Sequence, residues 1–318
     1  MSAPAIPDNA ELIGVDWGSS RLRIHLIDHA GTALETITLD PGVLKTERNA
    51  QRQILVDALH PWVSKRPNIP IFAAGMIGSR SGLVETNPLP TPVDVAALTA
   101  AMLTLRLDDR ITVQVFPGLV DKSGEFDDLI RGEEAQVFGW LDDVGESGPA
   151  LLVLPGTHSK WIRLVGNTVS TFHTFPTGEL FEMLLAMPSL SQAIAANGRI
   201  PNPAERDSSF REGATLGSKA QGILHDIFTI RTRLLATTGS RPLVLDEYLS
   251  GMLIGYEIAE ALSRGLLREV EHAVLISEGD LKRRYRIALE INAVAIVEGG
   301  ESNFCHGVVA VYRRFSRP

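Results

Sequence analysis

Two segments of the same design, one in each half of the chain, constrain the fold more than any other feature of the sequence. Residues 13–27 contain an apolar stretch, a turn of glycine and serine, and a stretch in which apolar and polar residues alternate. Residues 151–165 repeat this pattern. Alternation with a period of two is typical of a strand. A turn and a further strand-like stretch follow each segment, at 33–39 and 169–175. Two such three-stranded meanders predict an internally duplicated fold.

The turns of the two segments are suited to binding phosphate. The first turn contains Gly18 and Ser19, and the second contains Gly156 and Thr157. Because glycine has no Cβ, backbone N–H groups in such a turn can approach a phosphate closely. Asp16 stands two residues before the first glycine, where a carboxylate can hold a hydrated Mg²⁺ against that phosphate. An ordinary hairpin with a solvated aspartate is the alternative for the first segment taken alone. Together, the two turns would clamp the phosphates of one nucleotide in a cleft between two domains.

The rest of the first half completes an α/β order. Apolar residues at helical spacing predict helices at 46–65 and 94–105, the second with Asp94 as its N-cap. Short apolar runs predict strands at 69–74 and 111–116. Three meander strands followed by helix, strand, helix and strand form the ribonuclease-H-like arrangement.

The second half repeats this order and adds a final helix. Gly251 and Gly255 allow close packing of a helix predicted at 243–264. The other elements predicted after the second meander are strands at 272–277 and 291–297 and helices at 281–289 and 302–313. We therefore predict two ribonuclease-H-like domains, at residues 1–130 and 131–318, the second with a helical insertion at about 189–240.

Composition places the chain among globular proteins of the cytoplasm. Its 318 residues suggest about two domains, and 44% hydrophobic residues can build their cores. A net charge of −8 and the lack of a basic stripe argue against nucleic-acid binding. The single cysteine, Cys305, cannot form an internal disulfide, which is consistent with a reducing compartment. Residues 1–10 lack the pattern of a signal peptide, and no apolar run approaches the roughly 20 residues of a membrane span.

Two adjacent carboxylates, Glu133 and Glu134, begin a predicted helix. Acidic residues in a first turn interact favourably with the helix dipole, so capping is one interpretation. The other is a general base, because phosphoryl transfer to a hydroxyl needs a carboxylate near the accepting oxygen. The pair lies between the two phosphate-type turns in sequence, which favours the base, with Glu134 ahead of Glu133.

Two loops are candidates for substrate contact. The first, residues 75–82, is rich in glycine and serine and follows a predicted strand, where ligands bind in open α/β sheets. A plain connecting loop is the alternative. The second precedes a predicted helix that Thr177 is expected to cap. The candidates for substrate contact in these two loops are Gly75, Met76, Ser79, Arg80, Thr177 and Glu179.

The chain resembles the 2-dehydro-3-deoxygalactonokinase family, within the superfamily of sugar kinases, heat-shock ATPases and actin. The resemblance covers nearly the whole chain, and its motifs occur in the order of that family. They are Val15–Ser20, Ala74–Ser79, Arg131–Glu134, Leu154–Trp161 and Thr177–Leu180. The resemblance implies an actin-like ATPase fold of two ribonuclease-H-like domains with an interdomain cleft. It also implies ATP- and Mg²⁺-dependent phosphorylation of 2-dehydro-3-deoxy-D-galactonate on its terminal hydroxyl, to the 6-phosphate, in galactonate catabolism.

The resemblance implies roles for individual residues. Asp16 would coordinate Mg²⁺ through water. Glu134 or Glu133 would be the acidic residue that takes part in catalysis. The residues expected to bind the nucleotide are Gly18, Ser19, Ser20, Gly156, Thr157, Lys160 and Gly279. Arg23 joins the substrate contacts named above. The expected partner is a small sugar acid, and neither nucleic acid nor a membrane is expected as a partner. A homodimer is left open.

One departure from the family leaves alternatives open. Residues 277–280 read Ser-Glu-Gly-Asp, where the family usually has an Ala-Gly-Thr turn, and two carboxylates near a polyphosphate repel it. Arg80 also departs from a smaller polar residue. The alternatives are therefore a kinase of another sugar acid or polyol, and a nucleotide-dependent regulatory protein without transfer activity.

Overall fold

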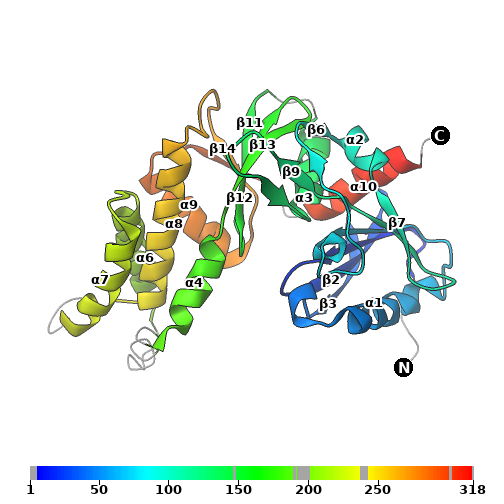
Figure 1. Ribbon diagram of the computed structural model, residues 1–318, viewed down its shortest axis with the longest axis horizontal. Helices are drawn as coiled ribbons and strands as arrows, with labels where there is room; N and C mark the ends of the chain where they lie inside the picture. The colour runs from blue at the N-terminus through cyan, green and yellow to red at the C-terminus, as the bar shows by residue number, and fades with distance from the viewer. Residues whose placement is uncertain are drawn as a thin grey trace. The chain divides into compact units, whose positions relative to one another are not determined.

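The structure is a computed structural model (Figure 1). It describes residues 6–145, 148–188, 191, 201–236, 243–300 and 303–316. Packing divides the chain into two compact units. Unit 1 consists of Met1–Gly148, Leu164–Phe172 and Gly300–Pro318, and unit 2 consists of Pro149–Arg163 and His173–Gly299. In the described part of the chain, no helix is both long and apolar enough to cross a membrane.

Unit 1 contains a six-stranded sheet with the order β3-β2-β1-β4-β8-β7. Its strands are β1 (Ala10–Trp17), β2 (Leu22–Asp28), β3 (Ala33–Leu39), β4 (Ile71–Gly75), β8 (Thr112–Val115) and β7 (Leu103–Arg106). The first three strands pair antiparallel, whereas β4 runs parallel to β1, and β8 runs parallel to β4. The first predicted meander is therefore confirmed.

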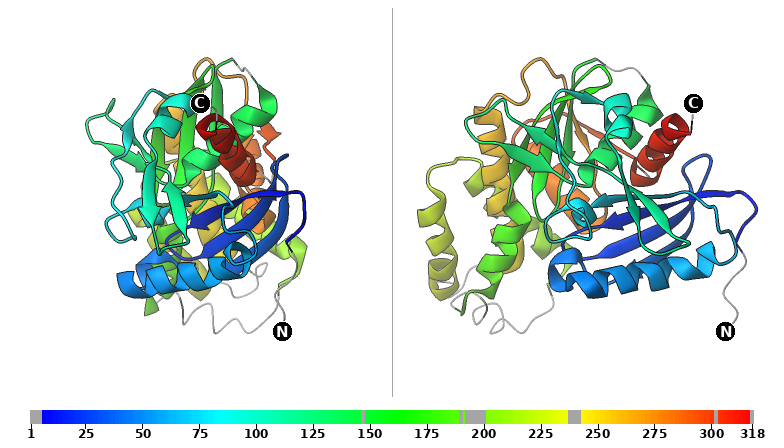
Figure 2. Two further views of the ribbon diagram at one scale, coloured as in Figure 1. Left: turned by 90° about the vertical axis from the view of Figure 1, so that its right-hand side faces the viewer. Right: turned by 45° about the vertical axis from the view of Figure 1, so that its right-hand side comes forward.

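Helices cover both faces of this sheet, as Figure 2 shows. On one face, α1 (Arg48–Val63) packs Leu55 and Leu59 into a core that also contains Ile13 and Val15 of β1. On the other face lies α10 (Asn303–Phe315), whose Val308 would lie 3.6 Å from a Cβ placed on Gly14. Because β1 is covered on both faces, its residues 12–15 form a continuous apolar run that ends before Asp16.

Unit 1 also contains several shorter elements around this sheet. A small sheet has the order β10-β9-β5. These elements are η1 (Val43–Lys45), η2 (Met76–Gly78), β5 (Leu89–Pro90), β6 (Val93–Asp94), α2 (Val95–Ala100), β9 (Leu119–Asp121), β10 (Asp128–Ile130) and α3 (Glu133–Val144).

The helix predicted at 94–105 is only partly correct. Asp94 does cap α2, because its Oδ1 accepts a hydrogen bond of 2.8 Å from the Ala97 N–H. The helix ends at Ala100, however, and Leu103–Arg106 form the edge strand β7. Half-buried and exposed residues alternate along β7, and this period of two matches a strand paired with β8.

Apart from residues 164–172, which belong to unit 1, unit 2 contains a sheet that repeats the strand order of the first sheet. Its strands follow the order β15-β14-β11-β12-β13, which matches β8-β4-β1-β2-β3. They are β11 (Ala150–Leu154), β12 (Ser159–Val165), β13 (Thr168–Phe175), β14 (Ala273–Leu275) and β15 (Ile296–Glu298). The pairs β11–β14 and β14–β15 are parallel, as β1–β4 and β4–β8 are. The repeated order confirms the predicted duplication.

The helices of unit 2 pack closely through glycines. They are α4 (Thr177–Ala186), α6 (Pro203–Gly217), α7 (Ile223–Ala236), α8 (Leu245–Ser263) and α9 (Gly279–Ile291). A Cβ on Gly251 would lie 2.1 Å from the Phe210 carbonyl oxygen, and one on Gly255 would lie 2.5 Å from that of Ala214. The predicted packing role of these glycines is confirmed. Figure 1 shows α6 and α8 side by side.

The strand predicted at 291–297 begins too early. Helix α9 continues to Ile291, and Ala293 has a positive φ of 55° in the turn that follows. The Val294 N–H donates to the Leu289 carbonyl in this turn, so only Ile296–Glu298 pair as β15. Short apolar runs do not distinguish the end of a helix from a buried strand.

The predicted domain boundary between residues 130 and 131 stays a prediction. It follows the repeated order of elements, whereas the two units follow side-chain packing, which places α3 and α10 in unit 1. Within the stretch predicted as a helical insertion, α6 contributes Phe210 and Ala214 to the main core of unit 2. Residues 189–190, 192–200 and 237–240 of that stretch lie outside the described residues, as do residues 1–5 and 302.

Candidate active site

Three segments of unit 1 meet where β1 and β4 end. Trp17 and Gly75, the last residues of these strands, are paired in register. Gly75 has a φ of 97°, and a Cβ on it would lie 2.6 Å from the Trp17 carbonyl oxygen. Gly132, with a φ of 107°, precedes α3, and a Cβ there would lie 3.1 Å from the Gly75 Cα. The two glycines therefore allow the start of α3 to lie against the carboxyl ends of both strands.

Asp16 lies at this edge, on the penultimate position of β1. Its Oδ2 accepts a hydrogen bond of 2.7 Å from Nη2 of Arg23, its register partner on β2. Burial raises the pKa of Asp16, and the Arg23 charge and hydrogen bond act in the opposite direction. The side chain keeps 18% exposure, and among the described residues its Oδ1 has no hydrogen-bond partner. One accessible carboxylate oxygen suits a hydrated divalent cation.

The turn after β1 is held in a tight conformation. The Gly18 N–H donates to the Arg21 carbonyl at 2.9 Å, and the Val43 N–H donates to the Gly18 carbonyl at 3.1 Å. A Cβ on Gly42 would lie only 2.1 Å from the Ser19 carbonyl oxygen, so a glycine is needed there. Ser20 is exposed. Residues 42–43 thus hold the backbone of this turn in place.

The two carboxylates of α3 both fold back on the chain that precedes the helix. Glu133 Oε2 accepts from the Arg131 N–H at 3.0 Å, and Glu134 Oε2 accepts from the Gly132 N–H at 2.5 Å. Both bonds go to N–H groups that precede the first residue of α3, and both acidic residues stand in the first turn of that helix. Glu134 is nevertheless fully buried, and its Oε1 has no hydrogen-bond partner among the described groups. Burial, followed by the neighbouring Glu133 charge, raises the pKa of Glu134 to about 8. Such a group can take up or release a proton near neutral pH.

Arg131 is a structural residue of this site to which the sequence pattern assigned no role. Its Nη1 donates to the Gly78 carbonyl at 2.6 Å and to the Pro117 carbonyl at 3.1 Å. Its Nη2 donates to the Thr86 carbonyl at 3.1 Å. The arginine thereby ties the residue before Gly132 to the loop after β4. Only its position beside the Gly-Glu-Glu motif could have suggested this function.

The loop after β4 uses two of its predicted substrate side chains internally. The Ser79 hydroxyl donates to the Met76 carbonyl at 2.7 Å and closes the turn of η2. Arg80 Nε donates to Glu85 Oε1 at 2.9 Å, with 89% of the arginine side chain exposed. Gly75 lies against the residue that precedes α3, and Met76 after it is half-buried.

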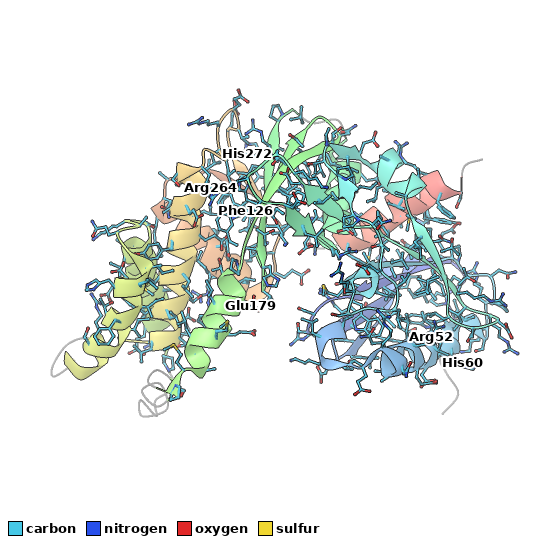
Figure 3. All side chains as sticks on the ribbon, in the orientation of Figure 1. Arg52, His60, Phe126, Glu179, Arg264 and His272 are labelled. Carbon is cyan, nitrogen blue, oxygen red and sulfur yellow. The ribbon has the colours of Figure 1, made fainter. Side chains whose placement is uncertain are left out.

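In unit 2, the hairpin loop between β11 and β12 contacts the start of α4. A Cβ on Gly178 would lie 2.5 Å from the Gly156 carbonyl oxygen, so the helix approaches the loop as closely as glycine allows. The Glu179 N–H donates to the Thr157 carbonyl at 3.0 Å. Glu179, labelled in Figure 3 near the N-terminal end of α4, also contacts His158, with 2.9 Å between Oε2 and Nε2.

Two other predicted residues of unit 2 bond away from that loop. Lys160 is 5% exposed, and its Nζ donates to Thr174 Oγ1 at 2.9 Å. Thr177 is the first residue of α4 and does not cap it, because Pro176 occupies the N-cap position. The prediction of Thr177 as a cap was therefore wrong. Its hydroxyl instead donates to the buried Glu257.

Residues 278–280, at the start of α9, contain the two carboxylates that depart from the family pattern. Gly279 has a φ of 57°, and a Cβ on it would meet nothing within 4 Å. Asp280 bonds to Arg283 Nε at 2.8 Å and to Arg206 Nη2 at 3.0 Å, and it lies 3.3 Å from Arg284 Nη2. These arginines lower the pKa of Asp280, opposing the effect of burial, and compensate its charge. The arginines therefore offset the charge of Asp280, one of the two carboxylates of this segment.

The predicted site residues thus fall into two groups. In unit 1 they are Asp16, Gly18, Ser19, Ser20, Arg23, Gly75, Met76, Ser79, Arg80, Glu133 and Glu134, and in unit 2 they are Gly156, Thr157, Lys160, Thr177, Glu179 and Gly279. Their individual roles stay predictions.

Comparisons with known proteins show which family the chain belongs to. A sequence profile of the 2-keto-3-deoxy-galactonokinase family matches residues 16–311. The chain is 32% identical over 283 residues to a probable 2-dehydro-3-deoxygalactonokinase of Rhizobium meliloti, covering 87% of this chain and 88% of the relative. It is 29% identical over 309 residues to the 2-dehydro-3-deoxygalactonokinase of Escherichia coli, covering 95% and 97%.

Solved structures give the same result. A candidate 2-dehydro-3-deoxygalactonokinase from Sinorhizobium meliloti superposes with a TM-score of 0.82 at 29% identity, covering 95% of this chain and 96% of that one. Component A of the (R)-2-hydroxyglutaryl-CoA dehydratase of Acidaminococcus fermentans superposes with a TM-score of 0.51 at 11% identity, covering 96% and 99%, a likeness of fold alone. The fold is that of the actin-like ATPases. The chain belongs to the 2-keto-3-deoxy-galactonokinase family, and it is a kinase.

Proposed function

We propose that the chain transfers the γ-phosphoryl group of ATP to the C6 hydroxyl of 2-dehydro-3-deoxy-D-galactonate. The family match over residues 16–311 carries this proposal. The names of the two relatives, both 2-dehydro-3-deoxygalactonokinases, support the same substrate. The arginines that bond to Asp280 offset one of the two carboxylates, Glu278 and Asp280, that favoured a protein without transfer activity. We also propose that the enzyme works in the cytoplasm, where ATP is supplied.

We propose Glu134 as the general base, with Glu133 as the alternative. Glu134 has a free buried oxygen, Oε1, and a pKa of about 8, so it can hold the proton that leaves the hydroxyl. As that proton moves to the carboxylate, the C6 oxygen forms a bond to the γ-phosphorus, and the bond from that phosphorus to the ADP oxygen breaks. Glu133 is half-buried and closer to solvent, which is the feature in its favour.

Asp16 is the residue proposed to hold Mg²⁺. Its side chain is partly exposed, which fits a water-mediated ligand, and Arg23 already occupies Oδ2. A bound Mg²⁺ would neutralise charge on the phosphate oxygens. The Gly18–Arg21 turn next to Asp16 is braced by residues 42–43, which suits phosphate contacts from Gly18, Ser19 and Ser20. Gly156, Thr157, Lys160 and Gly279 are proposed as nucleotide contacts of unit 2.

For the sugar acid, the observations favour some of the proposed contacts over others. Gly75 lies against Gly132 at the start of α3, and Met76 is the next residue of the chain. Thr177 and Glu179 begin α4 beside the Gly156 loop. Ser79 and Arg80 bond within their own loop, so a contact with substrate would have to replace these bonds. Arg23 is bonded to Asp16 and would contact the substrate from that position.

The direct experiment incubates the purified protein with ATP, Mg²⁺ and 2-dehydro-3-deoxy-D-galactonate. We expect ADP release and a product whose phosphorus NMR spectrum shows an ester at C6. A panel of other sugar acids and polyols separates this substrate from the alternative kinases. Absence of ADP release with every acceptor would contradict the proposal.

A further inference from the structure

A fully buried carboxylate in unit 2, Glu257, takes no part in the reaction proposed above. It lies in the middle of α8 with an exposure of 3% for the whole residue. Three donors bond to its two oxygens. The Trp161 Nε1–H donates to Oε1 at 2.8 Å, the Tyr285 hydroxyl donates to Oε2 at 2.6 Å, and the Thr177 hydroxyl also donates to Oε2.

Ser159 extends this group of residues. Tyr285 gives its one hydroxyl proton to Glu257, so its oxygen must accept from Ser159, whose Oγ lies 2.6 Å away. Burial raises the pKa of Glu257 above its ordinary value, although the surrounding donors act in the opposite direction. The three direct donors all bond to carboxylate oxygens as acceptors.

The network connects two segments that the proposed function uses. Ser159 and Trp161 lie on β12, directly after the Gly156–Thr157 loop, and Thr177 begins α4. Glu257 bonds directly to Trp161 and to Thr177. It therefore holds β12, which follows the loop, and the first residue of α4 in one rigid group. A buried hydrogen-bond network with all members paired holds its side chains in a single arrangement.

The network also fixes the direction of one further hydrogen bond. A threonine hydroxyl has one proton and can also accept. Because Thr177 gives its proton to Glu257, any other partner of this hydroxyl must be a donor. A substrate hydroxyl meets that condition, whereas a carboxylate or keto oxygen does not.

We propose that Glu257 is a positioning residue which makes the Thr177 hydroxyl an obligatory acceptor for one hydroxyl of the sugar acid. The inference rests on the proposed function, because it takes Thr177 as a substrate contact. Glu257 itself touches no substrate. The C4 and C5 hydroxyls are the candidates, since the C6 hydroxyl is the one that reacts.

The test compares steady-state kinetics of ADP release for Glu257→Gln and the wild type, varying each substrate in turn. An amide at position 257 can donate to Thr177, which frees the threonine proton and removes the enforced direction. We expect the KM for the sugar acid to rise about tenfold, the effect of one hydrogen bond, with the KM for ATP changed less than twofold. Thr177→Val should match this effect, and the double variant should be no worse than either single one.

Tyr285→Phe is the matched control. It removes a donor from the same carboxylate and leaves the bond from Thr177 in place. We expect a lower Tm and a sugar-acid KM within twofold of the wild type. A comparable rise in KM for Tyr285→Phe, or an equal rise in the KM for ATP in Glu257→Gln, would overturn the inference in favour of a packing role.

Substrate analogues provide a second readout. For one of the analogues that lack the C4 or the C5 hydroxyl, Glu257→Gln and the wild type should have the same KM. A persistent tenfold difference with both analogues would overturn the inference. If the wild type releases no ADP but binds the sugar acid, the kinase proposal fails and the same comparison is made with Kd. If it neither binds nor phosphorylates any sugar acid, both proposals fail.

Discussion

The guanidinium of Arg23 holds one oxygen of the Asp16 carboxylate, with 2.7 Å between Nη2 and Oδ2. The two residues are register partners at the end of the β1–β2 pair, so the sheet itself sets their separation. Among the described residues, no hydrogen bond is made to the other carboxylate oxygen, Oδ1. The pair thus presents one acceptor at the carboxyl end of β1, directly before the Gly18 turn.

Asp16→Asn should therefore lower kcat by at least about 100-fold, because the amide lacks the charge that holds Mg²⁺. The fold should remain, since an amide oxygen can still accept from Arg23. Titration of Mg²⁺ in the ADP-release assay measures the effect. Asp109→Asn makes the same chemical change at an exposed loop carboxylate of unit 1 and should leave kcat unchanged. Near-normal turnover of Asp16→Asn would reject the metal role.

The pH profile of activity tests Glu134 as the base. With a pKa of about 8, Glu134 is protonated at pH 7, so kcat/KM of the wild type should rise with pH up to about 8 and then level off. Glu134→Gln should lose at least about 100-fold in kcat and show no such rise, while the Kd for ATP stays the same. If Glu133→Gln removes the rise and Glu134→Gln keeps it, the two roles are reversed.

The same raised pKa makes a prediction for stability. Between its ordinary value of 4.5 and about 8, Glu134 carries a proton in the folded protein that the unfolded chain has released. The free energy of unfolding therefore falls as pH rises through this range. Relative to the wild type, Glu134→Gln should gain on the order of 1–3 kcal/mol between pH 4.5 and pH 8.5. Urea denaturation at several pH values measures this gain, and parallel curves for the two proteins would contradict it.

Gly178→Ala tests the contact between α4 and the Gly156 loop. The new Cβ would lie 2.5 Å from the Gly156 carbonyl oxygen and 2.8 Å from the Thr157 Cα, so the loop must move. We expect the KM for ATP to rise about tenfold, although alanine favours a helix over glycine by about 1 kcal/mol. Gly148→Ala, where a Cβ meets nothing within 4 Å, is the control. An unchanged KM for ATP in Gly178→Ala would show that the loop does not contact the nucleotide.

Much of the fold could be predicted from the sequence because its patterns are local. The period of two in residues 22–28 and 159–165 is set by the backbone geometry of a strand, so both meanders were predicted correctly. The errors occur at short apolar stretches. Leu103–Arg106 are a strand only because β8 pairs with them, and Ile291 remains helical because α9 continues through it.

For the candidate site, the sequence alone determined which residue types stand at the strand ends and turns. The Gly18 and Gly156 turns, Asp16 and the two adjacent glutamates follow from local spacing. Tertiary structure decided what these groups can do. The burial that separates Glu134 from Glu133 comes from packing against other segments, and desolvation, not sequence, sets its pKa. Glu257 bonds to Thr177 and Trp161, which lie 80 and 96 residues away along the chain. Hydrogen bonds of that kind exist only once the chain has folded, so no local pattern could reveal them.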